Sequence, residues 1–407
     1  MKKMELLAPA GDLEKLKIAI DYGADAVYFG GEAFGLRAGA GNFTKEEIRE
    51  GAKYAHERGK RIYMTVNIFA HNEDIRLLPD FLRGIADLEI DAFLVSDPGV
   101  IAVFREILPD AVLHLSTQAN TTNYMTAKFW YDMGISRIVT AREMSFEELR
   151  EFRREIPEDM EIEAFVHGAM CISYSGRCLM SNFFTGRDDN RGACTHTCRW
   201  KYAVVEETRP GEYLPVYENE RGTYIFNSKD LCMIEHVPEL VDAGITSFKI
   251  EGRMKSAYYT AVVTNAYRMA IDAYLRDGAD YRFDPQLFRE LESVSHRDYG
   301  TGYWFDTPRE EANVCKNMGY IREKAYIATA LGYDAASGRA TFVQRNKVSA
   351  GETVELISPG KVGRAFTACE LCDEAGAPIE SAPHPGMIFS LRVPFAVKAG
   401  DILRGGN

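Results

Sequence analysis

The pattern that decides the fold first appears in residues 5–30, ELLAPAGDLEKLKIAIDYGADAVYFG, as a short apolar run, an amphipathic stretch and a second short apolar run. The same pattern recurs over about the first 250 residues. The short runs are rich in Val, Ile, Tyr and Phe and are too short for buried helices, so we expect them to be buried parallel strands. They are Glu5–Ala10, Ala26–Gly30, Arg61–Val66, Ala92–Asp97, Leu113–Gln118, Arg137–Ala141, Ile162–Gly168 and Ser247–Gly252.

The stretches between these runs have the apolar spacing of amphipathic helices. They include Asp12–Tyr22, Thr44–Arg58, Leu77–Leu88 and Ser145–Arg154. Thr44 followed by Glu47 fits a capping box, in which the hydroxyl accepts a backbone N–H that the helix leaves unpaired. Three helix-to-strand junctions contain a glycine, which can end a helix in a left-handed conformation. These glycines are Gly23, Gly134 and Gly244.

Eight strands alternating with helices predict a TIM-like (β/α)₈ barrel. A doubly wound open sheet is the alternative, but no G-x-G-x-x-G motif follows the first strand. From about Lys316 the pattern changes to short segments of alternating apolar and polar residues separated by Gly, Asp and Pro. We therefore expect a barrel domain over residues 1–316 and a small antiparallel β-barrel over residues 317–407.

In such barrels the reacting groups lie at the carboxyl ends of the strands. His167, Glu251 and Arg253 occupy such positions and are candidate catalytic or substrate-binding residues. Alternate spacing places Lys249, Glu251 and Arg253 on one face, where Arg can bind a carboxylate or phosphate and Glu can orient it. The alternatives are ion pairing inside the barrel and, for His167, a hydrogen bond to a backbone carbonyl.

The segment after the seventh strand, about residues 169–241, is too long for an ordinary βα connection. Five of the eight cysteines lie in it: Cys171, Cys178, Cys194, Cys198 and Cys232. Structural zinc sites usually contain paired C-x₂-C ligands, and this spacing fits them poorly. Irregularly spaced thiolates can hold an iron–sulfur cluster, because they need only converge in space. The residues alone therefore leave three readings, namely a cluster, a zinc site or free thiols.

Arginines accompany these cysteines although the chain as a whole has a net charge of −12. Such a surface repels nucleic acid, so an RNA contact needs a local basic patch. The candidates for substrate or RNA contact are Arg177, Arg187, Arg191 and Arg199. Neutralisation of thiolates, or simple solvation, explains these cations equally well.

The chain shows no apolar stretch approaching the length of a membrane span, and its beginning does not resemble a signal peptide. We therefore expect a cytoplasmic protein without membrane contact, in which thiols stay reduced. No H-E-x-x-H, G-x-S-x-G or P-loop motif occurs.

The cysteine-bearing run over residues 163–181, EAFVHGAMCISYSGRCLMS, resembles the signature of the collagenase-like "unknown-type" peptidase family. It meets every position of the pattern E-x-F-x-x-G-A-M-C-x₄-G-x-C-x-M-S. Residues 190–202, 228–232 and 249–253 resemble the same family. The resemblance spans residues 5–255 and continues into the β-rich tail, and it implies a TIM-like barrel followed by a β-barrel.

The resemblance also implies a chemistry. Several members of the family are linked to oxygen-independent hydroxylation and carry a 4Fe–4S cluster on four cysteines. Relatives act on ubiquinone precursors, on ribosomal RNA or on the wobble uridine of tRNA, with prephenate as a requirement for the RNA reactions. A chain of about 400 residues with one barrel and one tail domain is most similar to the tRNA 5-hydroxyuridine branch.

Carried over to this sequence, the resemblance makes Cys171, Cys178 and Cys194 cluster ligands, with Cys232 as the fourth and Cys198 as the alternative fourth. The expected function is hydroxylation of a tRNA wobble uridine to 5-hydroxyuridine, with a 4Fe–4S cluster and with prephenate, a small dicarboxylate, as co-substrate. The alternatives are a peptidase, as the family name says, and a non-catalytic RNA-binding accessory protein.

Overall fold

The structure is a computed structural model that describes residues 4–35, 42–171, 173–200, 217–219, 222–224, 228–305, 321 and 323–406. The chain divides into two compact units. The barrel unit comprises Met1–Ile20, Ala24–Lys255 and Arg297–Tyr320, and the C-terminal unit comprises Asp21–Gly23, Ser256–His296 and Ile321–Asn407. Residues 256–296 thus group with the C-terminal strands, whereas the sequence pattern changes only near residue 316. The domain boundary read from the sequence stays a prediction.

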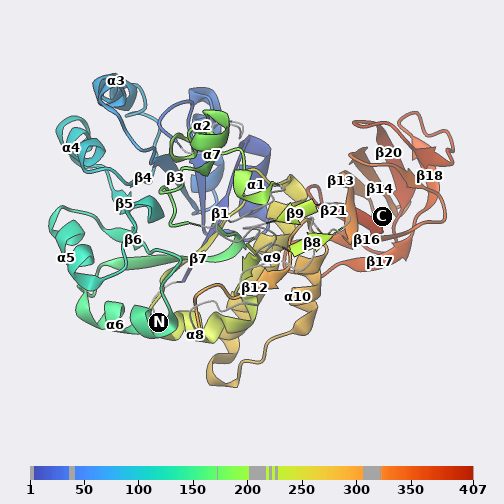
Figure 1. Ribbon diagram of the computed structural model, residues 1–407. Helices are drawn as coiled ribbons and strands as arrows, with labels where there is room; N and C mark the ends of the chain where they lie inside the picture. Colours follow the sequence, from blue (N-terminus) through green and yellow to red (C-terminus); the bar gives the residue numbers. More distant parts are fainter. Residues whose placement is uncertain are drawn as a thin grey trace, which may run out of the picture. The chain divides into compact units, whose positions relative to one another are not determined.

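Eight parallel strands form a closed barrel, which confirms the predicted TIM-like fold (Figure 1). Their order is β11-β1-β2-β3-β4-β5-β6-β7, and β7 pairs with β11 to close the ring. Each strand lies within or overlaps one of the eight apolar runs, and nearly every strand residue is buried. The strands are β1 Glu5–Pro9, β2 Ala26–Gly30, β3 Arg61–Val66, β4 Ala92–Val95, β5 Leu113–Leu115, β6 Arg137–Val139, β7 Glu161–Ala169 and β11 Ser247–Ile250.

Helices connect the strands around the outside of the barrel (Figure 1). They are α1 Leu13–Asp21, α2 Lys45–His56, α3 Asn72–Arg83, α4 Pro98–Ile107, α5 Tyr124–Asp132, α6 Phe146–Glu155 and α8 Val237–Asp242, and the short 3₁₀ helix η1, Thr117–Ala119, follows β5. The predicted capping box begins α2, with the Glu47 amide donating to Thr44 Oγ1 over 3.2 Å. The three junction glycines have φ of 104°, 82° and 80°, which confirms the predicted left-handed turns.

Helix α3 differs from its prediction, because it begins at Asn72 rather than near Leu77. Asp74 accepts a hydrogen bond from the backbone amide of His71 at 2.7 Å and so caps the earlier start. The helix ends before Gly84, which shortens it at the other end. The apolar spacing alone does not show this cap.

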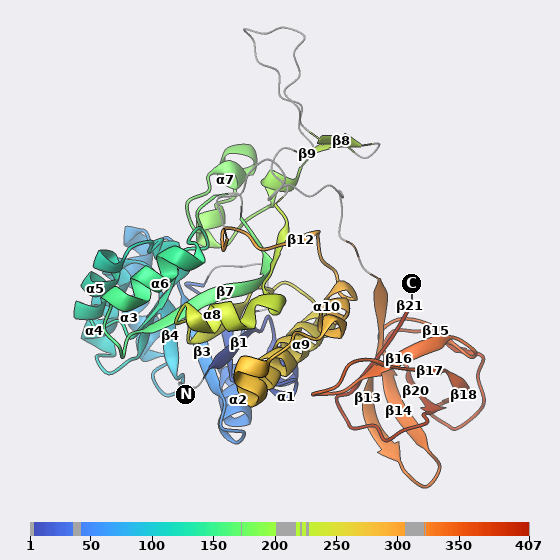
Figure 2. The ribbon, with the colours of Figure 1, turned by 90° about the horizontal axis from the view of Figure 1, so that it is seen from below.

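Strand β7 continues beyond the barrel wall, where β10, Asp230–Cys232, pairs with it in antiparallel register. Strand β12, Tyr299–Gly300, then pairs with β10. Between β7 and β10 runs the cysteine-rich segment, whose helix α7, Met180–Thr185, lies at the end of the barrel opposite the N-terminus (Figure 2). The segment also contains η2 Asp189–Arg191, η3 Thr197–Arg199, β8 Tyr217–Asn219 and β9 Gly222–Tyr224.

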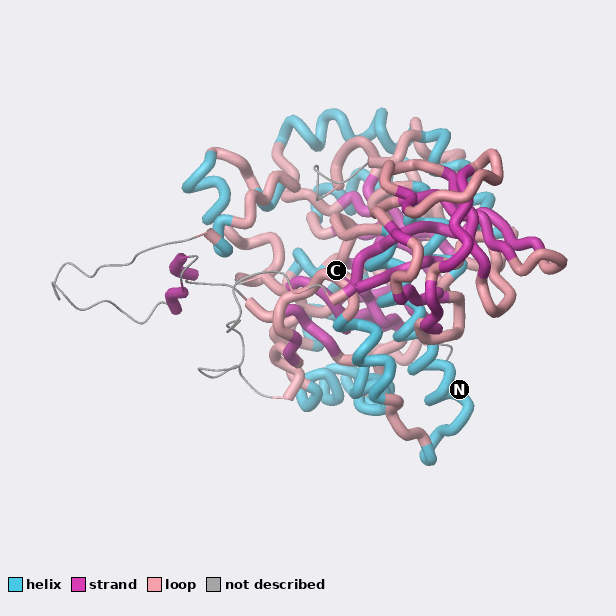
Figure 3. The backbone as a smooth tube through the Cα atoms, turned by 90° about the vertical axis from the view of Figure 1, so that its right-hand side faces the viewer, coloured by secondary structure: helices cyan, strands magenta, loops and turns pink. Residues whose placement is uncertain are grey.

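The C-terminal unit combines two helices, α9 Ala257–Asp277 and α10 Pro285–Glu292, with an antiparallel sheet. The sheet is a half-barrel of order β17-β16-β21-β13-β14-β20-β18 (strands in magenta in Figure 3). Its strands are β13 Lys324–Asp334, β14 Arg339–Gln344, β16 Thr353–Ile357, β17 Arg364–Thr367, β18 Cys369–Asp373, β20 Ile388–Arg392 and β21 Ile402–Gly406, beside the short pair β15 Val348–Ser349 and β19 Ser381–Ala382.

A buried ion pair holds a helix of this unit to its sheet. Arg404 of β21 lies 2.8 Å from Glu290 of α10, and both side chains are almost fully buried. The second carboxylate partner of Arg404 is Glu355 of β16, at 2.7 Å. The stacked rings of Phe342 and Phe389 lie in the core of the sheet. No helix in the described ranges has the length and apolar character needed to cross a membrane.

Candidate functional site

A pocket of about 760 Å³, open to solvent, lies at the carboxyl ends of the barrel strands. We call it the thiol pocket. This is where the reacting groups of such barrels lie. It is lined by Tyr28, Thr65, Asn67, Leu94, Ser116, Thr117, Gln118, Arg142, Phe165, Cys171, Ser173, Tyr174, Ser175, Gly176, Cys178, Asp189, Asn190, Cys194, Lys249, Glu251 and Arg253.

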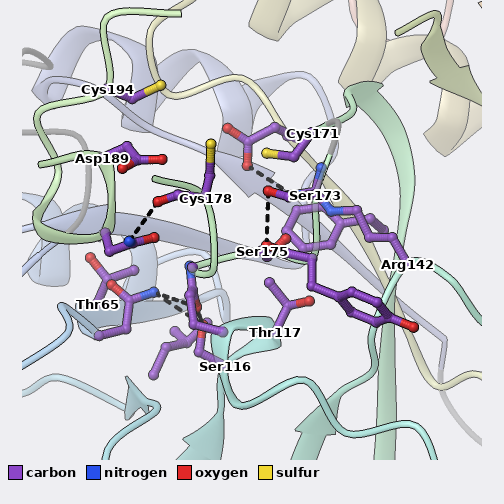
Figure 4. Close-up of a pocket in the computed structure, with 18 of the residues that line it drawn as sticks. Thr65, Ser116, Thr117, Arg142, Cys171, Ser173, Ser175, Cys178, Asp189 and Cys194 are labelled. Carbon is purple, nitrogen blue, oxygen red and sulfur yellow. Dashed lines mark hydrogen bonds and ion pairs between the residues drawn. The ribbon is translucent and has the colours of Figure 1, made fainter. Parts of the chain in front are cut away.

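Three cysteines from different parts of the cysteine-rich segment line this pocket. Figure 4 shows Cys171, Cys178 and Cys194 along one side with Asp189 beside them, and Thr65, Ser116 and Thr117 across from them. The folding of the segment thus brings together thiols that are far apart in sequence.

The fourth cysteine of the predicted set lies elsewhere. Cys232 is buried on β10, where it pairs in register with His167, and it lines no part of the thiol pocket. Cys198 lines an adjoining hollow together with Cys171, Cys178 and Cys194. The structure therefore places both candidates near this end of β7, and the fourth ligand stays a prediction.

The thiols differ in their surroundings. Burial raises the pKa of the Cys178 thiol to about 11, and the carboxylate of Asp189 adds to the rise. Cys194 Sγ accepts a hydrogen bond from the backbone amide of His196 at 3.4 Å. In the described part of the chain, no three Cys, His, Asp or Glu side chains are close enough to bind a single metal ion.

Two buried arginines, Arg142 and Arg253, add positively charged groups to the pocket. The side chain of Arg142 is 7% exposed, donates from Nη1 to the Ala169 carbonyl at 2.7 Å and lies 3.9 Å from Glu251. Its guanidinium also lies over the Phe165 ring, 3.9 Å from the centroid. Arg142 Nε is buried and has no hydrogen-bond partner among the described residues. A buried guanidinium with an unused donor, facing a pocket, is suited to bind an anion.

Arg253 reaches the pocket because two glycines make room for it. A Cβ on Gly30 would overlap the guanidinium of Arg253, and a Cβ on Gly11 would overlap its backbone carbonyl. The guanidinium lies 3.5 Å from the hydroxyl of Thr65. Glycine at both positions is therefore a condition for this arginine to lie at the pocket wall.

Lys249 and Glu251 line the same pocket as Arg253, in keeping with their alternate spacing. Lys249 donates to Glu163 at 2.6 Å inside the barrel. Burial lowers the pKa of Lys249, although Glu163 opposes this effect by favouring the charged form. Glu251 accepts from the Tyr28 hydroxyl at 3.4 Å. Lys249 is thus a group paired inside the barrel, and Arg142 and Arg253 are the other cationic side chains that line the pocket.

His167, the remaining catalytic candidate, does not line the thiol pocket. It is 1% exposed, and its ring lies 5.3 Å from that of Tyr299 on β12. The structure therefore places His167 in the wall between β7 and the added strands, apart from Glu251 and Arg253.

The four candidate arginines of the cysteine-rich segment are not equivalent. Arg177 and Arg187 are exposed. Arg191 forms a bidentate ion pair with Asp74, with distances of 2.6 and 2.9 Å, and this hydrogen bonding holds the pKa of Asp74 below its usual range. The backbone of Arg199 belongs to η3, and its side chain lies outside the described part of the structure.

Several pocket residues were not among the sequence candidates, notably Arg142, Asp189 and Tyr28. Arg142 follows the sixth strand, so its place at a strand end is a signal that could have identified it. Asp189 carries no such signal, because only the folding of the long segment brings it to the thiols.

A closed (β/α)₈ barrel whose open end carries thiols from an insertion after the seventh strand defines a class of barrel proteins with a thiol-lined pocket at the strand ends. The chain belongs to Peptidase family U32. Residues 11–314 match the family's main domain, and residues 322–404 match the Peptidase family U32 C-terminal domain. The resemblance to the collagenase-like peptidase family is thereby confirmed.

Relatives whose names state a function align with most or all of the chain. The "tRNA hydroxylation protein P1" of Bacillus subtilis (strain 168) is 40% identical over 406 residues, covering 100% of this chain and 96% of the relative. The "tRNA hydroxylation protein P" of Escherichia coli (strain K12) is 38% identical over 437 aligned positions, covering 97% and 94%. A protein named "Collagenase" from Porphyromonas gingivalis (strain ATCC BAA-308 / W83) is 32% identical over 366 residues, covering 87% and 86%.

Proposed function

We propose that this chain is an enzyme that hydroxylates a uridine of tRNA, at the wobble position, to 5-hydroxyuridine. Full-length relatives from two bacteria are named tRNA hydroxylation proteins, which supports the reaction class and the substrate. The observation that carries the proposal is the convergence of three thiols and two buried arginines on one pocket at the catalytic end of the barrel.

The proposed cofactor is a 4Fe–4S cluster held by Cys171, Cys178 and Cys194 with Cys232, or with Cys198 in its place. Its support is the donor set, because three thiols line one side of the pocket. A bound cluster supplies the one-electron chemistry that the side chains of a protein lack. The exposure of Cys171 leaves the cluster site open toward the pocket in which a substrate would lie.

The proposed co-substrate is a small dicarboxylate, prephenate. Arg142 and Arg253 are buried, and both face the pocket. Guanidinium groups bind carboxylates through paired hydrogen bonds, and in a buried site these bonds are strong. Glu251 lies 3.9 Å from Arg142 and can orient its guanidinium.

The exposed Arg177 and Arg187 are the proposed contacts to the RNA. A local pair of cations offsets the repulsion that a net charge of −12 exerts on RNA. Arg191 has a different role here, since its ion pair with Asp74 ties the cysteine-rich segment to the start of α3.

The test is anaerobic purification followed by iron and sulfide analysis of wild type, Cys171→Ala and Cys369→Ala. We expect about four irons and four sulfides per chain in wild type, as a 4Fe–4S cluster requires. Cys171→Ala should lose most of both. Cys369→Ala is the matched control, because Cys369 is also exposed but lies on β18 of the C-terminal sheet.

Zinc, or no metal, in wild type would contradict the cluster. An iron-free protein that still binds tRNA would favour the alternative of a non-catalytic RNA-binding accessory protein, which needs no redox cofactor.

The second candidate function is peptidase activity, which the relative named "Collagenase" favours. Gelatin cleavage by cluster-free protein, lost on substitution of Cys194, would support it. Cys194 is the thiol to substitute because His196 lies beside it. Gelatin left intact by both cluster-free and cluster-loaded protein would exclude this function.

A further inference from the structure

A second pocket adjoins the thiol pocket at the ends of β3, β4 and β5. It contains about 560 Å³ of empty space, and we call it the side pocket. Asn67, Gln118 and Asn190 line both pockets. A ligand bound in one pocket can therefore extend into the other. The remaining wall includes Phe69 and Arg177.

Phe69 presents an aromatic surface to this pocket. Its side chain is large and apolar, yet the residue is 49% exposed. The guanidinium of Arg177 lies over the ring, 5.5 Å from the centroid, and Arg177 Nε donates to Asn120 Oδ1 at 2.8 Å. Aromatic rings and arginine guanidinium groups are the side chains on which proteins stack unpaired nucleobases.

Hydrogen bonds hold the backbone of Phe69 against the cysteine-rich segment. The backbone amide of Phe69 donates to the Asn190 carbonyl at 3.0 Å, and Arg191 Nη1 donates to the Phe69 carbonyl at 3.1 Å. The side chain of Asn190 donates to the Cys178 carbonyl at 2.7 Å. Phe69 is thus tied to the segment that carries the thiols, and little ordering remains when a ligand stacks on its ring.

The polar groups of the side pocket favour a base over a phosphate. Asn67 Nδ2 donates to Gln118 Oε1 at 3.1 Å, so two hydrogen-bonded amide side chains form part of the wall of this pocket. Asp97 also lines the pocket, with one carboxylate oxygen accepting from the Val100 amide. A carboxylate repels phosphate but accepts a hydrogen bond from the N–H groups of a base.

We infer that the side pocket binds an unpaired nucleobase next to the target uridine, stacked on Phe69 beside Arg177. The inference rests on the proposed function, since it places the target uridine in the thiol pocket. It adds a specificity site that the cysteines and the buried arginines do not provide. Loop nucleotides suit it because their bases are unpaired and can be turned outward.

The experiment measures the affinity of full-length wild type, Phe69→Ala, Phe69→Tyr and Phe129→Ala for a fluorescent anticodon stem-loop at one fixed salt concentration. Stacking is worth about 1–3 kcal/mol per base, so Phe69→Ala should weaken binding about 5- to 150-fold. Phe69→Tyr keeps the ring and should restore affinity. Phe129 is a matched control, because it is 57% exposed but lies on α5.

A second RNA identifies the stacked group. In it the two nucleotides flanking the target uridine lack their bases. Wild type should bind this RNA about 5- to 150-fold more weakly than the intact loop, whereas Phe69→Ala should bind both RNAs alike.

Equal affinity of wild type and Phe69→Ala for the intact loop would overturn the inference and leave the proposed function standing. So would a Phe69→Ala defect that is the same for both RNAs, which would indicate that the ring contacts something other than a base. Failure of wild type to bind any tRNA or stem-loop would overturn the proposed function, and the inference with it.

Discussion

Arg253 reaches the pocket only where neighbouring residues lack side chains. A Cβ at Gly30 would overlap the guanidinium of Arg253, so the position of this side chain depends directly on glycine at residue 30. The sequence predicts Arg253 and Glu251 because both follow one strand at alternate positions. It does not single out Asp189 or Tyr28, because their approach depends on loops and strands that are distant in sequence.

The first prediction concerns Gly30→Ala. The added methyl must displace the guanidinium of Arg253, and overpacking of this kind costs about 1–3 kcal/mol of stability. We expect tRNA hydroxylation to fall at least about tenfold, since a misplaced binding group loses orientation. The measurements are the hydroxylation rate and the thermal unfolding midpoint.

Gly332→Ala is the control for this change. A Cβ at Gly332 meets no atom within 4 Å, so neither stability nor activity should change appreciably. If Gly30→Ala behaves like Gly332→Ala, Arg253 has no role in the reaction.

At the scale of elements, strand β10 connects the cysteine-rich segment to the barrel. Its first residue, Asp230, pairs with Arg297 at 2.6 Å, with the two side chains 2% and 3% exposed. Burial raises the pKa of Asp230, but the charges of Arg297 and Lys255 and the hydrogen bonds from Arg297 together outweigh that effect, so the pKa lies below its usual value. The pair therefore holds β10, and with it Cys232, in place.

The second prediction concerns Asp230→Asn, which removes the buried carboxylate that pairs with Arg297. Breaking a buried ion pair from one side costs about 3–5 kcal/mol, so the free energy of unfolding should fall by about that amount at pH 7. The lowered pKa means that this contribution is complete above the unfolded pKa of about 3.9 and is lost as the pH falls through the lower folded value.

Unfolding in urea from pH 8 to pH 2.5 checks the sign. The difference between wild type and Asp230→Asn should stay constant down to about pH 5 and shrink at lower pH. A difference that grows on acidification would contradict the assignment of a charged Asp230.

The elements also show what the sequence can predict. Short apolar runs predict all eight barrel strands. A strand that is buried on both faces is apolar along its length, so it can be recognised without knowing which strands pair with it. Helix α3 was misplaced, since its start depends on the Asp74 cap rather than on apolar spacing. The additions β10 and β12 were not foreseen, because residues 230–232 and 299–300 are too short to carry a strand pattern.

At the scale of the whole molecule, the chain divides into two compact units. The grouping of α9 and α10 with the C-terminal sheet was not predicted, because the ion pair of Glu290 with Arg404 joins residues that lie far apart in sequence. The half-barrel itself follows from alternating segments after residue 323.

The third prediction is that calorimetry resolves two unfolding transitions. Glu290→Ala removes one of the two carboxylate partners of the buried Arg404, and the loss of about 1.5–3 kcal/mol should lower the transition of the C-terminal unit. Asp230→Asn should lower the other transition. A single transition that both variants lower equally would contradict the division into two units.

The measurement that tests the central claim most directly is mass spectrometry of tRNA nucleosides from a strain without its own tRNA hydroxylation proteins. The strain would carry wild type, Cys171→Ala or Cys369→Ala, each confirmed as expressed and folded. We predict that wild type and Cys369→Ala restore 5-hydroxyuridine and that Cys171→Ala does not. Restoration of 5-hydroxyuridine by Cys171→Ala would contradict a thiol-held cluster in the reaction, and its absence with wild type would contradict the proposed activity.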